Sequence, residues 1–226
     1  MKKKNPLLIL LLLLLAIPLV YFFWVNQNSK DMTIRQQLLK AFYPALMWMT
    51  RASGVNAKFI THAPDSAPAL FSSLHASLLN GQAFDWSSLK GKKVLLVNTA
   101  SDCGYTAQYA ELQELYDRYK DYLVVLAFPS NDFKEQEKGD AAAINALCQV
   151  NYGVKFPVLQ KSVVLPGATQ HPVYQWLTKA SQNGWNNQVP AWNFAKYLVD
   201  EEGRLLLYAD PSVSPMDKRL QELITR

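Results

Sequence analysis

Cys103 and Cys148 are the only two cysteines in this chain of 226 residues. Cys103 lies within VNTASDCGYTAQY (97–109), where an apolar run ends and a helical pattern begins. Unpaired N–H groups and the dipole at the start of a helix stabilise a thiolate. We therefore expect Cys103 to have a lowered pKa and high reactivity. The alternative is a buried cysteine that packs as a small apolar residue.

The sequence gives little support for a disulfide reductase, a disulfide-rich scaffold or a metal site. Gly104, Tyr105 and Thr106 follow Cys103, so the C-x-x-C pair typical of thioredoxin-class disulfide reductases is absent. Two cysteines are too few for a disulfide-rich scaffold or for a zinc site made of four cysteines. The three histidines are scattered and no Gly-rich phosphate loop is present. We predict neither a metal nor a cofactor.

The segments around the two cysteines predict an alternation of strands and helices. Apolar runs predict buried strands over 92–100 and 122–129, and apolar residues at helical spacing predict a helix over 107–120. The other expected elements are a short helix that contains Cys148 (140–151), strands 193–200 and 204–210 joined by EEG, and a closing helix over 215–226. This order predicts an α/β, thioredoxin-like fold with a central mixed sheet flanked by helices.

The N-terminus predicts a membrane anchor. Residues 6–25 carry no charge and are about as long as a transmembrane helix. A basic tail, residues 1–5, precedes them, and the positive-inside rule places this tail in the cytoplasm and the rest of the chain outside it. We expect a single-pass protein of a bacterial inner membrane that faces the periplasm, or of the endoplasmic reticulum facing the lumen. A cleaved signal peptide is the rival interpretation.

A stalk or linker, residues 26–68, is expected between the anchor and the domain. Within it, residues 31–53 have apolar positions near helical spacing, and Pro44 should kink or end that helix. The helix would pack on the domain or, alternatively, lie on the membrane surface. Of the formal charge of +5, the three lysines of the tail leave only +2 for the rest of the chain, so no nucleic-acid partner is expected.

Several motifs in order resemble those of the glutathione peroxidase family. Besides VNTASDCGYTAQY, they are LAFPSNDF (126–133), EQEKG (135–139), NYGVKFPV (151–158), HPVYQWL (171–177) and WNFAKYLVDEEG (192–203). The resemblance covers residues 69–226, the expected catalytic domain. It implies a thiol-dependent peroxidase that reduces hydrogen peroxide and organic or lipid hydroperoxides. A peroxide sensor that passes oxidation to a partner protein is the alternative.

The resemblance assigns four residues to the chemistry: Cys103, Gln136, Trp192 and Asn193. In the family the cysteine thiolate attacks a peroxide oxygen, and charge grows on the departing oxygen. Amide and indole N–H groups are neutral donors that can stabilise such charge. The family's usual GGQEPG is KEQEKG here (134–139), so the loop that carries Gln136 should be differently shaped and more charged.

The resemblance also implies a role for Cys148. Cysteine-type members often carry a resolving cysteine on the helix before NYGV, and Cys148 lies there, 45 residues after Cys103. The family's usual FPCNQF is FPSNDF here, so Ser130 replaces its other frequent cysteine and Asp132 replaces a glutamine. A peroxidatic and resolving pair implies a thioredoxin-like protein as reductant, with glutathione as the alternative. The other interpretation of Cys148 is a buried helix residue.

Overall fold

The computed structural model of the chain describes residues 6–55, 57–62 and 74–226, and in the first helix it describes side chains from residue 14 onward. The predicted basic tail, residues 1–5, lies outside the described residues, as do residues 56 and 63–68 of the predicted stalk or linker.

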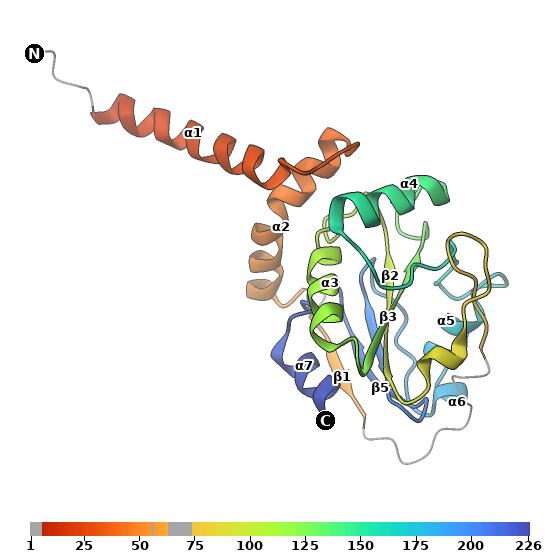
Figure 1. Ribbon diagram of the computed structural model, residues 1–226. Coiled ribbons are helices and arrows are strands. Elements are labelled where there is room, and N and C mark those ends of the chain that lie inside the picture. Colours follow the sequence, from red (N-terminus) through yellow and green to blue (C-terminus); the bar gives the residue numbers. More distant parts are fainter. Residues whose placement is uncertain (1–5, 56, 63–73) are drawn as a thin grey trace, which may run out of the picture.

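A mixed five-stranded sheet forms the centre of the molecule (Figure 1), as predicted. The strands are β1 (Phe59–Thr61), β2 (Lys93–Thr99), β3 (Leu123–Pro129), β4 (Lys196–Val199) and β5 (Leu205–Ala209), in the order β1-β5-β4-β2-β3. The β2–β3 pair is parallel, and the other pairs are antiparallel. The edge strand β1 was not predicted, because three residues are too few to show a period in the sequence.

Helices cover both faces of this sheet (Figure 1). The helical segments are α1 (Pro6–Asn26), α2 (Ile34–Ser53), η2 (Trp86–Leu89), α3 (Gln108–Tyr119), α4 (Ala141–Asn145), η3 (Ala146–Asn151), α5 (Pro172–Leu177), α6 (Ala180–Asn183) and α7 (Lys218–Thr225). Alternate residues of β2 separate the core into two clusters. Leu95 and Val97 pack with α2, α3 and α7, and the opposite face packs against α5. Both cysteines belong to the first cluster.

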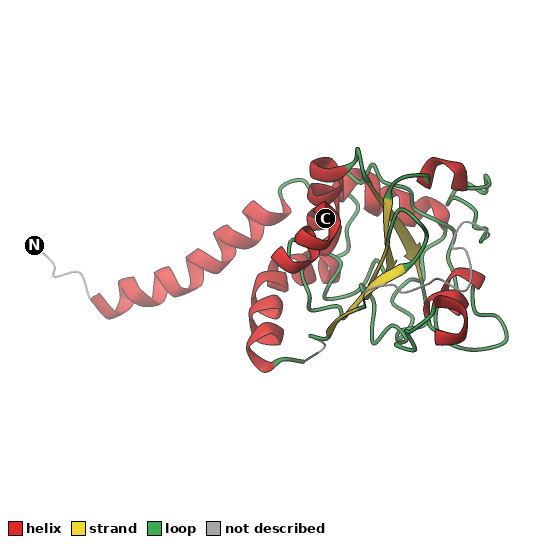
Figure 2. Cartoon of the chain, turned by 90° about the horizontal axis from the view of Figure 1, so that it is seen from below, coloured by secondary structure: helices red, strands yellow, loops and turns green. Residues whose placement is uncertain are grey.

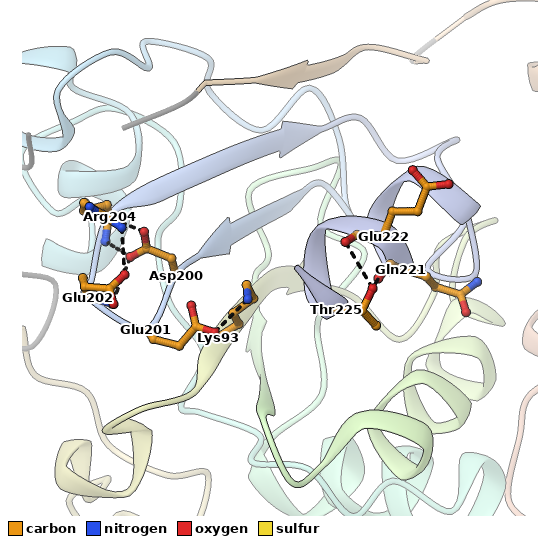
Figure 3. Close-up of polar contacts among 8 residues, drawn as sticks. All are labelled: Lys93, Asp200, Glu201, Glu202, Arg204, Gln221, Glu222 and Thr225. Carbon is orange, nitrogen blue, oxygen red and sulfur yellow. Dashed lines mark hydrogen bonds and ion pairs between the residues drawn. The ribbon is translucent and has the colours of Figure 1, made fainter. Parts of the chain in front are cut away.

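The predicted β4–β5 hairpin is present, and its charged tip is structural (Figure 3). Arg204 donates from Nε to Asp200 Oδ2 at 2.7 Å and from Nη2 to Glu202 Oε2 at 2.7 Å. Lys93 at the start of β2 donates to Glu201 Oε1 at 2.7 Å. The Arg204 pairs hold the hairpin turn together, and the Lys93–Glu201 pair ties it to the neighbouring strand β2.

Helix α1 extends away from the rest of the molecule (Figures 1 and 2). Within the described residues, no helix is long and apolar enough to cross a membrane. This finding contradicts the predicted transmembrane anchor over 6–25. It also contradicts the predicted single-pass localisation with the catalytic domain outside the cytoplasm.

Helix α2 packs against the first core cluster. It begins at a capping box, in which Thr33 Oγ1 accepts from Gln36 N and Gln36 Oε1 accepts from Thr33 N. Pro44 lies inside α2 and does not end it, contrary to one of our expectations. Tyr43 and Met47 are buried, and the Tyr43 hydroxyl donates to Glu111 of α3 at 2.5 Å. Of the two alternatives for this segment, the structure shows the helix on the domain.

Candidate active site

Cys103 lies in the turns that connect the end of β2 with the start of α3. Its backbone N–H donates to Thr106 Oγ1 at 3.0 Å. The same hydroxyl lies within hydrogen-bond distance of the carbonyl oxygens of Ala100 and Cys103, at 2.9 and 2.8 Å. These contacts of Thr106 hold the backbone of the turn in place and thereby orient the Cys103 side chain.

The Cys103 thiol is buried, with 1% of the residue exposed. Its Sγ accepts from Tyr105 N at 3.4 Å. The side chains of Trp192 and Asn193 act on the thiol as further donors and lower its pKa. Burial nevertheless raises the pKa of Cys103 to about 11, against the opposing effect of these three donors. The predicted lowering of this pKa is wrong. Helix α3 begins at Gln108, one residue after the predicted start, so the position of the helix was predicted well and the error lies in the burial of the thiol.

The structure brings Gln136 and Asn193 together beside Cys103. Asn193 donates from Nδ2 to Gln136 Oε1 at 3.0 Å. The carbonyl of Gln136 accepts from Asp102 N at 3.0 Å, which joins its loop to the turn of Cys103. Since the Asn193 side chain also lowers the pKa of the thiol as a donor, Asn193 connects Gln136 with Cys103.

Trp192, the fourth residue, is held from two sides. Its ring centroid lies 5.4 Å from that of Phe133, and Lys134 Nζ lies 5.7 Å from the ring centroid. Its carbonyl accepts from Asn98 Nδ2 at 3.0 Å, at the end of β2. Packing and backbone contacts thus fix the indole next to the thiol.

The loop that carries Gln136 has an unusual backbone. Lys134 and Glu135 have φ angles of 51° and 53°, in the left-handed region that favours glycine. They occupy the positions at which the family motif GGQEPG has its first two glycines. The loop therefore adopts the left-handed conformation without glycine. It places Gln136 next to Asn193 although its sequence differs from the family motif.

Cys148 is fully buried in η3, a π-helical turn that follows α4. Where one short helix was expected over 140–151, the hydrogen-bond pattern changes after Asn145. Burial raises the pKa of Cys148 to about 12, and the Tyr109 side chain opposes this effect. Both cysteines are free thiols.

The close approach of α2 to the turn of Cys103 was not predicted from the sequence. Gln36 donates from Nε2 to the Ser101 carbonyl at 3.3 Å, and Arg35 Nε lies 3.3 Å from Asp102 Oδ1. A Cβ atom placed on Gly104 would lie 3.0 Å from a methyl carbon of Leu46 in α2. The amphipathic pattern of 31–53 showed that α2 has an apolar face but could not show what that face covers.

Glu137, directly after Gln136, was also missed. It is fully buried and accepts from the Ser101 hydroxyl at 2.9 Å. No signal in the sequence separates it from exposed Glu135, because both lie in the same polar run.

A cleft of about 370 Å³ opens beside these residues, between the start of α2, the turn of Cys103, the loop of Gln136 and η3. Among the residues with described coordinates, no cluster of three or more histidine, cysteine or acidic side chains could hold a metal ion. The site consists of protein groups around a thiol.

Comparison with known proteins identifies the family. The family model of glutathione peroxidase matches residues 71–178. The glutathione peroxidase-like peroxiredoxin GPX5 of Chlamydomonas reinhardtii is 44% identical over 146 residues, which cover 64% of this chain and 89% of that protein. The chain belongs to the glutathione peroxidase family. The predicted enzyme class, a peroxidase of the glutathione peroxidase type, is thereby confirmed.

Further glutathione peroxidase relatives agree in sequence and in structure. Glutathione peroxidase-like peroxiredoxin 2 of Saccharomyces cerevisiae is 40% identical to this chain, and the match covers 65% of this chain and 91% of that protein. The crystal structure of Trgpx in its apo form superposes with a TM-score of 0.54 at 32% identity, over 71% of this chain and 98% of that one. The predicted thioredoxin-like α/β fold is thereby confirmed.

Proposed function

We propose that this peroxidase reduces hydrogen peroxide and small organic hydroperoxides through Cys103 as the peroxidatic residue. The observation that carries the proposal is the set of donors around one thiol: Tyr105 N and the side chains of Trp192 and Asn193. Donors from three residues around a single sulfur favour its thiolate form, which is the nucleophile.

In the proposed first step, the Cys103 thiolate attacks one peroxide oxygen and the O–O bond breaks. Cys103 becomes a sulfenic acid, and the departing oxygen leaves as water or an alcohol after it takes up a proton. The amide of Gln136, which Asn193 holds in place, is a donor that can stabilise charge on that oxygen. Because the thiol is buried, a small hydroperoxide has easier access to it than a bulky one.

In the proposed second step, Cys148 attacks the sulfenic acid and forms a disulfide with Cys103. A disulfide needs Cα atoms within about 7 Å of each other, so the segment that carries Cys148 must move if the two lie farther apart. Helix α4 and the π-helical η3 are short, and short helices are marginal in water without tertiary contacts. Their helical hydrogen bonds therefore resist unfolding only weakly, and most of the cost lies in exposing Ile144, Leu147 and Cys148, which are buried in the core.

We propose a thioredoxin-like protein as the reductant, in preference to glutathione. The charged residues that line the cleft beside Gln136 are Asp31, Asp102, Glu135, Glu137 and Lys138. Acidic side chains outnumber basic ones there, and glutathione, with two carboxylates and one ammonium group, carries a net negative charge. Repulsion disfavours its approach, whereas a protein reductant can attack an exposed disulfide from outside the cleft.

Peroxide consumption in the presence of thioredoxin or of glutathione tests this proposal. Wild type should turn over with thioredoxin, and Cys148→Ser should consume about one equivalent of peroxide and then stall with that reductant. Trp24→Phe, on exposed α1, is a control that should behave as wild type. Unimpaired turnover of Cys148→Ser with thioredoxin would show that Cys148 does not resolve the sulfenic acid.

A further inference from the structure

Lys196 is a buried lysine that the proposed steps leave unused. It is the first residue of β4 and is 0% exposed, although a lysine is almost never fully buried without a partner of opposite charge. Within the part of the chain that the structure describes, it forms no ion pair. Removing such a group from water is costly, so its position calls for a reason beyond packing.

The Lys196 side chain donates to two backbone carbonyls. Its Nζ lies 2.8 Å from the Phe194 oxygen and 3.5 Å from the Pro211 oxygen. The Pro211 carbonyl also accepts from Gln108 Nε2 at 2.7 Å, and Gln108 is the first residue of α3. Lys196 therefore connects the start of α3 with the backbone that directly follows two residues of the candidate site.

Phe194 has a backbone conformation that a bulky side chain disfavours. Its φ angle is 70°, in the left-handed region, where such a residue is rare and the conformation costs free energy. Its side chain is fully buried and packs edge-on against Tyr109, with 5.4 Å between the ring centroids. A residue keeps a strained backbone only where its surroundings fix it.

Two hydrogen bonds fix this backbone, one on each side of the Phe194 Cα atom. Before it, Phe194 N donates to the Asn98 carbonyl at 2.5 Å, and after it the Phe194 carbonyl accepts from Lys196. Peptide groups are planar, so φ and ψ describe the rotation between these two groups, and holding both holds the strained conformation. Asn98 also donates from Nδ2 to the Trp192 carbonyl at 3.0 Å, which fixes the preceding residues.

The same backbone directs the Trp192 and Asn193 side chains into the site. Asn193 donates from Nδ2 to Gln136 Oε1 at 3.0 Å. The Gln136 carbonyl in turn accepts from Asp102 N at 3.0 Å, one residue before Cys103. If the peptide group that follows Asn193 rotated toward an unstrained conformation, both side chains would change direction.

We propose that Lys196 is a positioning residue of this peroxidase: it holds the Phe194 carbonyl and thereby keeps the two side chains before Phe194 at the Cys103 thiol. The inference rests on the proposed function, since it needs Cys103 as the nucleophile. Lys196 acts through the backbone and takes no part in the transfer of electrons or protons.

This role does not depend on the charge of Lys196. Burial lowers the pKa of Lys196 to about 7, and the carboxylates of Glu111 and Asp210 oppose this effect. The ammonium and the amine form both carry N–H groups, so either can donate to the Phe194 carbonyl. Loss of the donor is therefore the change that tests the role.

Lys196→Met removes the donor and keeps the length of the side chain, with Lys93→Met as the matched control. Lys93 is also buried, 5% exposed, on the neighbouring strand β2, but it pairs with Glu201 at the hairpin tip, 2.7 Å away. After one equivalent of hydrogen peroxide, stopped-flow mixing with acid quench and mass spectrometry follows loss of the Cys103 thiol. Lys196→Met should lose it at least about tenfold more slowly than wild type, and Lys93→Met at a rate within about threefold, because catalysis is sensitive to small displacements of groups around the reacting atom.

Nuclear magnetic resonance of the indole N–H groups distinguishes positioning from a general loss of structure. The chain has six tryptophans, and Trp192→Phe assigns the signal of Trp192. In Lys196→Met this signal should shift. The signal of Trp185, whose indole donates to the Leu205 carbonyl at 2.7 Å, should stay in place. A lysine that only stabilised the fold would move both signals or neither.

The proposal would be overturned if folded Lys196→Met slowed loss of the Cys103 thiol by less than about tenfold, if Lys93→Met slowed it equally, or if the Trp192 signal did not shift separately from that of Trp185. If Lys196→Met fails to fold, as judged by near-ultraviolet circular dichroism, the double variant with Lys196→Met and Asp210→Asn takes its place under the same criteria. It also removes a buried carboxylate that interacts with the lysine. Peroxide consumption by Cys103→Ser at the wild-type rate would instead overturn the proposed function.

Discussion

At Cys103, burial and hydrogen bonding act in opposite directions. Three donors favour the thiolate, yet removal from water dominates and raises the pKa to about 11. Entry of water or of a hydroperoxide would restore part of the lost solvation while the donors stay in place. The hydrogen-bond donors therefore stabilise the thiolate most effectively when water or a hydroperoxide has entered the site.

Glu137 should make folding stability depend on pH. Its pKa is about 7 in the folded protein and has an ordinary value of 4.5. Between these values the folded state binds more protons than the unfolded state, so the free energy of unfolding falls as pH rises through this window. The difference corresponds to about 3 kcal/mol as an upper estimate.

Urea unfolding at pH 5 and pH 8 measures this effect. The free energy of unfolding of wild type should fall relative to that of Glu137→Gln between the two pH values, by up to about 3 kcal/mol. Other titrating groups are common to both proteins and cancel in the comparison. The same pH dependence in both would mean that Glu137 does not titrate in this range.

Among the elements, the loop of Gln136 carries backbone strain. Glu135 holds a φ of 53° with no glycine to relieve it. Such a residue costs about 1–2 kcal/mol, and glycine removes most of that cost while making the unfolded chain more flexible. We expect Glu135→Gly to raise the free energy of unfolding by about 0.5–1 kcal/mol, as measured by urea unfolding. A loss of stability would show that the side chain or its ion pair with Lys138 matters more than the strain.

Helix α2 should protect the Cys103 thiol. Met47 is buried in the same core cluster as Cys103, and its Sδ lies 3.9 Å from Gln108 Nε2 at the start of α3. Met47→Ala should lower the free energy of unfolding by about 2 kcal/mol or more and increase the rate at which iodoacetamide alkylates Cys103. Met49→Ala, whose side chain is exposed on the same helix, is the control. Equal alkylation rates in the two variants would show that α2 does not limit access.

The elements that the sequence predicts well are those with a strong local pattern. The runs that became β2 and β3 are buried along their whole length, so apolar continuity was a sufficient signal. The face that α2 buries was harder to predict, because its exposed face also carries apolar residues, among them Ile34, Phe42 and Trp48. Periodicity alone cannot tell which of two apolar faces has a partner.

At the scale of the whole molecule, family motifs located the site but not its energetics. The resemblance named the four residues around the sulfur and Cys148, and the structure brings Gln136, Trp192 and Asn193 to Cys103. Their roles in catalysis stay predictions. The raised pKa of Cys103 comes from burial in a core cluster to which α2, α3 and η3 contribute, and no short stretch of residues encodes that environment.

The central claim is that Cys103 reduces the peroxide and that Cys148 completes the reaction. Its most direct test is the stoichiometry of peroxide loss without any reductant, followed by mass spectrometry of the digested protein. Wild type should consume one equivalent and yield a peptide pair linked through Cys103 and Cys148, and Cys103→Ser should consume none. A tenfold slower rate corresponds to a loss of about 1.4 kcal/mol of transition-state stabilisation. Peroxide consumption by Cys103→Ser at more than about a tenth of the wild-type rate would therefore contradict the account.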